Sequence, residues 1–435
     1  MNRLMNPMNN SSKHIQSNRT DIISIGSVIL GNTIIYSSSQ ATAILLGLYI
    51  SYINLHITPI SAIQVGLIGT GYRVVEFIFD PIMGGLSDRL GRKFFLLIGP
   101  ICNLVAVLIY PSFTSLWVIF FLLFLEGLGA AMRSPVGISF LTDATSGSEK
   151  MRGRTMGVYQ LSSLTSLVLG YALGGIIWDW AGTSGFRLLA PVYIIGILII
   201  IFGTKDQKHV STDRLQIGKK LLLIFKNREL TRILPAWISL SAVLGAWMSQ
   251  SVFQLVGQIR NNDQLLVGRL NGTQVGLVLA IFSIIFASGT VIWGFLIGRI
   301  TKIKIMFVSL LGSFLCCFAI IVLNHAVFLI EGSSAWLFVI FLAMLGLGIF
   351  AQSGFTPTAL AFIGDLSENY PSNRGTIIGF YYLFLSVGQL LGAWFGGVFA
   401  QILQIDGIIL LTIILVTVGL VNLFSINYKQ MGDKL

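Results

Sequence analysis

A short stretch, YRVVEFIFDP at residues 72–81, places an arginine and two carboxylic acids inside a long apolar run. At about 100° per residue of an α-helix, Arg73, Glu76 and Asp80 lie within roughly 60° of one another and form one charged stripe. A charge at the centre of a membrane span costs about 2.5–3.5 kcal/mol on insertion scales, and such residues usually mark the paths of ions or protons. The stripe therefore predicts a coupling site for a cation or a proton. The alternative is an ion-pair network that only holds helices together.

A second charged pair stands in another apolar run. Glu126 and Arg133 are seven residues apart, so they share one helix face. Together with the stripe they give three acids against two arginines, and the one negative charge left over predicts a place for a proton or cation. The alternative for this pair is helix packing through an ion pair. In the second half of the chain, Ser283, Phe286 and Thr290 stand where the stripe would repeat, so the charges are an asymmetric addition.

The composition predicts an all-α membrane protein. Of the 435 residues, 54% are hydrophobic and 10% are charged, and the mean hydropathy is +0.84. Soluble domains carry about 25% charged residues, so a globular enzyme with an ordinary wet surface is excluded. A transmembrane helix needs about 20 mostly apolar residues. We expect twelve such helices, at 21–52, 62–86, 94–112, 115–141, 154–178, 187–203, 233–258, 273–298, 305–323, 334–362, 375–401 and 407–427.

The basic residues predict the orientation of these helices. With twelve spans both termini lie on one side, and 23 of the 28 lysines and arginines fall on that side. The positive-inside rule then places both termini in the cytoplasm of a bacterial-type inner or plasma membrane. It also explains the net charge of +11 without a nucleic-acid partner. The first twenty residues are polar and lack the apolar core of a signal peptide.

The chain divides into two similar halves. We expect a cytoplasmic tail at 1–20, a six-helix bundle at 21–204, a cytoplasmic linker with an amphipathic helix at 205–232, a second six-helix bundle at 233–427 and a tail at 428–435. Shifting the sequence by 222 positions aligns identical residues of spans 4–5 with spans 10–11, among them Pro135 with Pro357 and Asp143 with Asp365. Parallel six-span halves are a transporter architecture, with the substrate site near the midplane between them.

The loop between spans 2 and 3 reads GGLSDRLGRK, residues 84–93. It resembles the signature loop of the major facilitator superfamily, and the resemblance in spans and repeat covers residues 21–427. The resemblance implies the major facilitator fold, in which this loop latches the halves in the outward-open state. The matching loop of the second half has Gly298 in place of the acid, which predicts a weaker second latch. The gating residues implied are Gly84, Asp88, Arg89, Gly91, Arg92 and Lys93.

The longer stretch VGLIGTGYRVVEFIFDPIMGG, residues 65–85, resembles a narrower group, the cation-coupled sugar symporters of the melibiose permease type. Their second span has an arginine, an acid three residues on, and Asp-Pro seven and eight residues on, as Arg73, Glu76, Asp80 and Pro81 stand here. The resemblance implies that Glu76 and Asp80 bind the coupling cation, which in that family is sodium, lithium or a proton. Oxygen ligands suit such hard cations.

Spans 1, 4, 7 and 10 line the central cavity in the superfamily. The polar and aromatic residues of spans 1, 7, 10 and 11 suit an uncharged polar or an amphipathic solute; the alternative is that they form hydrogen bonds between helices. The expected cavity residues are Asn32, Tyr36, Gln40, Trp247, Gln250, Gln254, Gln352, Tyr381 and Gln389.

We therefore expect a secondary active transporter that moves a small polar or amphipathic solute by alternating access. Proton- or sodium-coupled uptake is the first hypothesis and proton-coupled efflux of drugs or metabolites the second. Span 5 has the glycines of an exporter signature but Tyr171 in place of its proline, and Leu123 stands where proton antiporters have an arginine, which leaves export open. No nucleotide-binding loop, nucleophile motif or metal cluster is present in the sequence, so we expect no enzyme, no metal and no cofactor beyond the coupling ion. The expected partners are the solute and the lipid bilayer, with the chain as a monomer.

Overall fold

The computed structural model describes residues 8–145, 148–205, 228–259, 263–326, 335–368 and 374–432. Within these ranges the chain folds into α-helices with two short 3-10 helices. Most of the linker expected at 205–232 lies outside the described residues. The structure therefore does not test its amphipathic helix.

Six long helices form the first half of the fold. Helix α1 begins at Met8, so it extends into the segment expected as a tail; Pro7 precedes it, and no proline or glycine interrupts it before Gly26. Two 3-10 turns, η1 (Tyr110–Ser112) and η2 (Gly182–Ser184), connect later helices. The helices are α1 (Met8–His56), α2 (Ala62–Leu90), α3 (Arg92–Ile109), α4 (Leu116–Ala144), α5 (Glu149–Ala181) and α6 (Gly185–Gly203).

In the described part of the second half, a turn interrupts the span expected at 334–362. A turn at Ser353 and Gly354 separates two shorter helices, and the ring of Trp293 lies against Gly354 while its Nε1 donates to the carbonyl of Phe350 over 2.9 Å. The helices are α8 (Arg228–Val256), α9 (Gly272–Leu296), α10 (Lys302–His325), α11 (Ala335–Gln352), α12 (Phe355–Glu368), α13 (Arg374–Leu403) and α14 (Ile405–Gly432).

Much of this fold is long and apolar enough to cross a membrane. Eleven candidate spans occur among the described residues, with mean hydropathies from 1.2 to 2.7. One of them, Lys150–Gly203, is 54 residues long and contains both α5 and α6, which are separate helices joined by η2. The expectation of an all-helical, multi-pass membrane protein is confirmed.

The ends of α2 follow from local sequence. The hydroxyl of Ser61 accepts a hydrogen bond from the backbone amide of Gln64, and the side-chain oxygen of Gln64 accepts one from the backbone amide of Ser61. This capping box satisfies two backbone amides. At the other end Gly91 has φ +97° and ψ 135°, and its amide donates to the carbonyl of Ser87. Residues with a side chain avoid this backbone region. Gly91 therefore sets the sharp turn by which α2 passes into α3.

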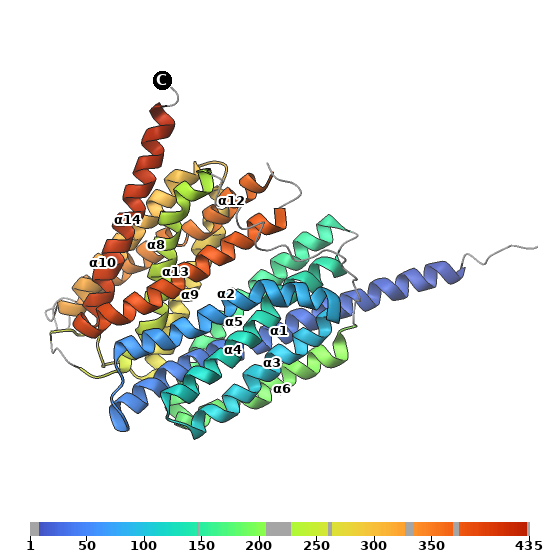
Figure 1. Ribbon diagram of the computed structural model, residues 1–435, viewed down its shortest axis with the longest axis horizontal. Helices are drawn as coiled ribbons and strands as arrows, with labels where there is room; N and C mark the ends of the chain where they lie inside the picture. Colours follow the sequence, from blue (N-terminus) through green and yellow to red (C-terminus); the bar gives the residue numbers. More distant parts are fainter. Residues whose placement is uncertain are drawn as a thin grey trace, which may run out of the picture.

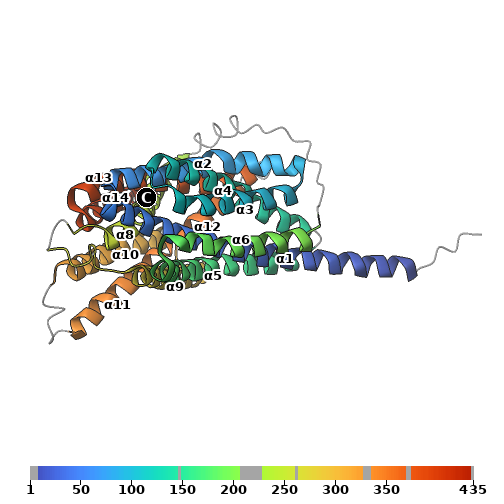
Figure 2. The same ribbon diagram turned by 90° about the horizontal axis from the view of Figure 1, so that it is seen from below.

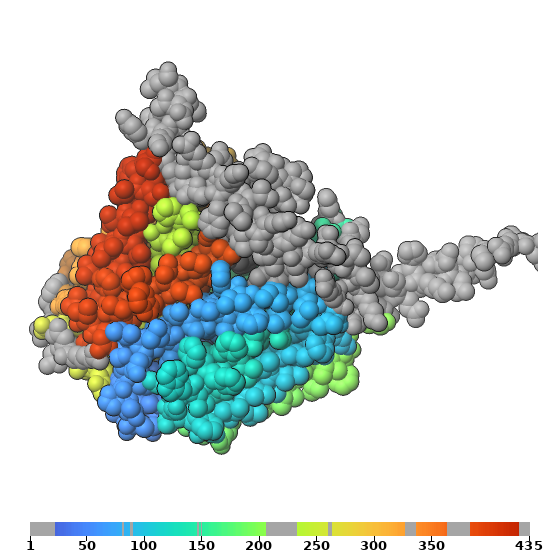
Figure 3. Space-filling view, viewed as in Figure 1, coloured from blue at the N-terminus to red at the C-terminus, as the bar shows by residue number. Residues whose placement is uncertain are grey.

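The two sets of helices, α1–α6 and α8–α14, meet along two long contacts. Helix α2 packs against α13, and α5 packs against α9. Figure 3 shows the first of these contacts on the surface, where α2 lies beside α13. The ribbons of the two sets converge where α1 ends and α2 begins, and they diverge toward the end where α2 finishes (Figure 1). We call these the converging end and the diverging end. The view from below shows α5 and α9 side by side and the start of α1 projecting from the bundle (Figure 2).

Small residues allow the close approach at the converging end. A Cβ atom on Gly397 of α13 would lie 2.7 Å from the carbonyl oxygen of Ala62 in α2, and one on Gly276 of α9 would lie 3.1 Å from Cα of Gly175 in α5. The first distance is shorter than real Cβ contacts, and the second is tighter than most of them; the same Cβ on Gly276 would also lie 2.5 Å from the carbonyl oxygen of Tyr171. Backbones that approach this closely are typical of membrane helices that associate through glycine.

The conformation of Gly91 yields the first prediction. In Gly91→Ala the new Cβ strains a backbone that side chains avoid, at a cost of about 1–3 kcal/mol, so the melting temperature of the detergent-purified protein should fall by a few degrees. The matched control is Gly153→Ala in α5, where the added Cβ meets nothing within 4 Å. Its melting temperature should be unchanged or slightly higher. Equal behaviour of the two variants in a thermal unfolding experiment would contradict this account of the turn.

Candidate functional site

The charged stripe of α2 lies immediately beyond the contact with α13. Thr70 donates to the carbonyl of Leu390 over 3.5 Å, and the stripe begins one turn further toward the diverging end. Nη1 of Arg73 lies 2.7 Å from Oε2 of Glu76, with side chains 30% and 18% exposed. Asp80 is partly buried and has no hydrogen bond or ion pair with a described residue. The stripe thus contains one ion pair and one carboxyl group that forms no ion pair with a described residue.

Arg133 of α4 is buried and stacks on an aromatic ring of α1. Its Cζ lies 4.9 Å from the centroid of Tyr36, the side chain is 4% exposed, and Nη1 has no hydrogen-bond partner among the described residues. A guanidinium over a tyrosine face gains a cation–π attraction, which is strongest away from water. The structure therefore gives Arg133 a partner in the predicted cavity residue Tyr36, and no carboxylate lies within ion-pair distance of it in the described residues.

Glu126 has a separate environment in the same helix. It accepts a hydrogen bond from the hydroxyl of Tyr110 over 3.1 Å, and its other oxygen is buried without a partner in the described residues. Seven residues of helix separate it from Arg133, which is about 10 Å along the axis at 1.5 Å per residue. Four of the five charges in the expected network therefore lie in three local contacts, Arg73 with Glu76, Arg133 with Tyr36, and Glu126 with Tyr110, and Asp80 lies in none of these.

Two tyrosines lie near these contacts. Arg73 stacks over the ring of Tyr72 at 5.4 Å, and Tyr72 lies within electrostatic reach of Glu76, Arg133 and Glu126. Tyr36 likewise lies within reach of Arg133, Glu76 and Arg73. Tyr72 was not among the residues predicted from sequence. Its signal was present, because an aromatic residue stands directly before the arginine of the stripe.

The signature loop is fastened to its own half. Nη2 of Arg92 lies 2.7 Å from Oδ2 of Asp143 at the end of α4, and Nζ of Lys93 donates to the carbonyls of Ile201 and Thr204 at the end of α6, over 2.7 and 2.6 Å. A lysine is favourable at a helix C-terminus because the last carbonyls there lack partners.

The two glycines of the loop, Gly84 and Gly91, have different surroundings. A Cβ on Gly84 would lie 3.9 Å from Pro135, which is ordinary contact, and Gly91 forms the turn described above. The side chains of Asp88 and Arg89 lie outside the described residues.

The expected cavity residues are distributed over several environments. Trp247 donates from Nε1 to Thr412 of α14 over 3.0 Å, and Gln250 donates to the carbonyl of Ala62 over 3.1 Å at the converging end. Asn32, Gln352 and Gln389 are buried, and Gln40 lies against Gly170. The side chain of Tyr381 lies outside the described residues. Of the expected cavity residues whose side chains the structure describes, Tyr36 contacts a charged residue of α4, Arg133.

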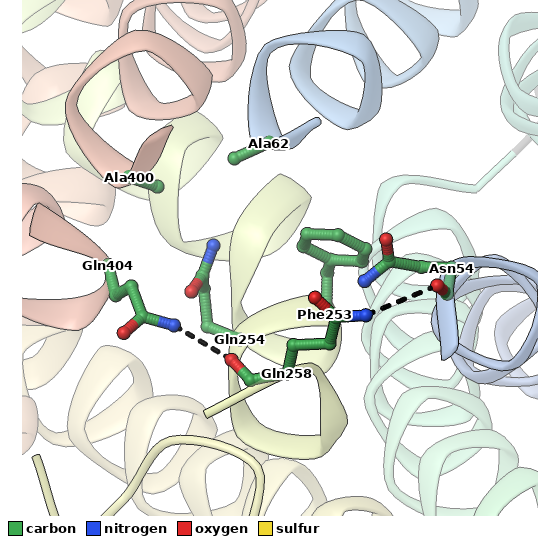
Figure 4. Close-up of a pocket in the computed structure, with 7 residues that line it drawn as sticks. All are labelled: Asn54, Ala62, Phe253, Gln254, Gln258, Ala400 and Gln404. Atoms are coloured by element: carbon green, nitrogen blue, oxygen red, sulfur yellow. Dashed lines mark hydrogen bonds between the residues drawn. The ribbon is translucent and has the colours of Figure 1, made fainter. Parts of the chain in front are cut away.

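A small polar pocket lies at the converging end, between α1, α8 and α13. Hydrogen bonds between its lining residues hold this end closed. Gln404 donates to the carbonyl of Gln258 over 2.9 Å, and the amide of Gln258 reaches the carbonyl of Asn54 at 3.5 Å (Figure 4). Gln254 and Phe253 also line it. Its neutral amide groups connect the two sets of helices, and Ala62, which also lines it, is about 16 Å along α2 from Arg73 at 1.5 Å per residue. We assign Gln254 to this closure.

A family model described as Major Facilitator Superfamily matches residues 28–350 and 267–434. The bacillibactin exporter of Bacillus subtilis (strain 168) is 27% identical over 348 residues, which cover 77% of this chain and 80% of that protein. The class B tetracycline resistance protein of Escherichia coli is 26% identical over 207 residues. The chain spans about half the length of that relative, 51%, and the match covers 43% of the chain.

Solved structures share the fold at low identity. The nucleoside transporter NupG superposes with a TM-score of 0.72 at 14% identity, covering 92% of this chain and 97% of that one. A bacterial homologue of the human lysosomal transporter Spinster, in an inward-facing and unoccupied conformation, superposes with a TM-score of 0.66 at 14% identity. That match covers 93% of this chain and 92% of the other.

The division of the charges yields the second prediction. In a double-mutant cycle, Arg73→Gln and Glu76→Gln should show a coupling energy of about 0.5–3 kcal/mol, because the two side chains are in contact. The control cycle of Glu126→Gln with Arg133→Gln should be additive within about 0.5 kcal/mol, since the two side chains are not in contact and the residues that each one touches directly are different. The measurement is the unfolding free energy in detergent. A large coupling between Glu126 and Arg133 would restore the single network expected from sequence.

Proposed function

Because the chain belongs to the Major Facilitator Superfamily, we propose that it is a secondary active transporter that exports a small amphipathic compound in exchange for protons. The observation that carries the proposal is Asp80, a carboxyl group that forms no ion pair with a described residue and stands one helical turn beyond Glu76 of the Arg73–Glu76 ion pair. A carboxyl in this position can hold a proton or a positively charged group of the solute, but not both. Mutual exclusion at one site is the requirement for exchange.

The direction of transport is argued from the relatives. Sequence alone favoured cation-coupled uptake, through the likeness of α2 to sugar symporters. Two relatives that match over more than three quarters of the chain, the bacillibactin exporter and multidrug resistance protein 2 of Bacillus subtilis (strain 168), have names that indicate export or resistance. We therefore prefer export, which was the second hypothesis from sequence.

The proposed topology has twelve spans in two parallel halves, with both termini in the cytoplasm. The separation of α5 from α6 by η2 supports the count, since the longest candidate span then represents two crossings. The excess of lysine and arginine on the side of the termini supports the orientation. The diverging end is then cytoplasmic, and the conformation is inward-facing, with the stripe accessible from the side on which an exporter takes up its solute. We propose that the chain works as a monomer.

Transport by everted membrane vesicles tests the function. Vesicles from cells that express the chain are energised to pump protons inward, and the uptake of tetracycline and of ethidium is followed by fluorescence. We expect uptake of at least one probe that collapses on addition of a protonophore, and we expect Asp80→Asn to reduce it to the level of vesicles without the protein. Glu126→Gln is the matched control, because its side chain keeps the hydrogen bond from Tyr110 and should leave transport largely intact. Energised uptake that survives in Asp80→Asn, or its absence in the wild type, would reject the proposed exporter.

The coupling ion has its own test. A ligand that binds only the folded state increases the free energy of unfolding, by about 2.7 kcal/mol at 100 times its Kd, and so raises the melting temperature. Under proton coupling, the purified protein should melt at the same temperature in sodium and in choline at equal ionic strength and pH. A sodium-specific increase in the wild type that is lost in Asp80→Asn would assign the site to sodium instead.

A further inference from the structure

The converging end is held by two contacts in which a side chain of one half caps a helix of the other half. Asp179, near the end of α5, accepts hydrogen bonds from the backbone amides of Gly272 and Thr273 in the first turn of α9, over 3.0 and 2.7 Å. Gln401, near the end of α13, accepts one from the amide of Ala62 in the first turn of α2, over 2.8 Å. The first amides of a helix have no partner within the helix, so each contact satisfies donors that would otherwise need water or another acceptor.

These two contacts occupy equivalent positions of the internal repeat. Asp179 and Gln401 are 222 positions apart, the offset that aligns spans 4–5 with spans 10–11. Their targets, Ala62 and Gly272, are 210 positions apart, the offset of the second and eighth spans.

The surroundings repeat as well. Both target helices begin with the same capping box, Ser61 with Gln64 in α2 and Asn271 with Gln274 in α9, at the same offset of 210. A glycine one turn before each capping side chain, Gly175 or Gly397, lies against the first residue of the capped helix. The repetition of the caps, their targets and the glycines indicates one device that is used twice.

The two copies differ in charge. Asp179 presents a carboxylate to the amides of Gly272 and Thr273, whereas Gln401 presents a neutral amide oxygen to the amide of Ala62. A negative charge at a helix N-terminus also interacts favourably with the helix dipole, and charge-assisted hydrogen bonds are roughly twice as strong as neutral ones. The contact between α5 and α9 is thus the stronger of the two.

We propose that Asp179 and Gln401 form a pair of unequal latches, which together hold the converging end closed, and that Asp179 sets most of the cost of opening it. Alternating access requires the converging end to open. When it opens, Asp179 separates from the N-terminus of α9, and Gln401 separates from the N-terminus of α2. The remaining caps of α2 and α9 come from their own capping boxes and stay in place. The latches act on the balance between the two conformations and are remote from the stripe of α2.

The distance between spin labels across the converging end tests the proposal. The labels are placed at Thr58→Cys, in the turn between α1 and α2, and at Ile259→Cys, after α8, both of which are exposed. The three native cysteines, Cys102, Cys316 and Cys317, are first replaced by alanine. No solute is added, so the result is independent of the proposed coupling at Asp80.

In Asp179→Asn the ratio of the long-distance to the short-distance population should rise about tenfold, the equivalent of roughly 1.4 kcal/mol. Gln401→Ala should raise the ratio by a smaller factor, because the cap that it removes carries no charge. Asp179→Glu retains the charge, so its population ratio should stay within about twofold of the wild-type ratio, the equivalent of about 0.4 kcal/mol. A wild-type ratio in Asp179→Glu would also show that a change of side chain at this position does not by itself open the converging end.

Three results would overturn the proposal. The first is an unchanged distance distribution in Asp179→Asn, with the variant folded by circular dichroism and eluting as a single species. The second is a larger shift in Gln401→Ala than in Asp179→Asn, which would reverse the order of the latches. The third is an equal shift in Asp179→Asn and Asp179→Glu, which would show that packing at this position, rather than charge, holds the end closed.

Discussion

The close packing of glycine-lined helices at one end of the bundle determines the rest of the structure. In a bilayer, apolar side chains gain little by leaving lipid for one another, so helices associate where their backbones can approach. Gly66 and Gly397 provide this approach between α2 and α13, and Gly175 and Gly276 provide it between α5 and α9. The two halves are therefore joined at one end. The charged residues of α2 follow directly after the joined segment, where side chains regain partial exposure.

Charge within a membrane span is the second constraint, and the chain meets it in three ways. Arg73 and Glu76 pair within one helix, Arg133 stacks on an aromatic ring, and Glu126 takes a hydrogen bond from a tyrosine. Each solution is local and involves no more than two neighbouring helices. Asp80 has none of these partners among the described residues, and for this reason we place the exchange of protons there.

The sequence predicted the fold class because hydropathy and basic residues report directly on the bilayer. It also identified Arg73, Glu76, Asp80, Glu126 and Arg133 as one set, since each is a charge inside an apolar run. Periodicity could not show that Arg133 faces Tyr36 and Glu126 faces Tyr110, because a helical wheel gives the direction of a side chain and not the identity of the helix opposite. The amides of Gln250 and Gln254 were expected in the cavity, and in the structure they lie at the converging end. In a sequence, a polar side chain at a helix interface and a polar side chain in a cavity both appear as one polar residue within an apolar run, so the sequence does not distinguish them.

The equivalence of Asp179 and Gln401 also bears on how such a protein can diverge. Both capping positions lie at the rim of the fold, several helical turns from the charges of α2 and α4. A single replacement at either position would alter the relative occupancy of the two conformations and leave the residues that meet the solute untouched. Selection can therefore adjust the turnover of the protein and its selectivity separately, and the two repeats provide two independent positions at which to do so.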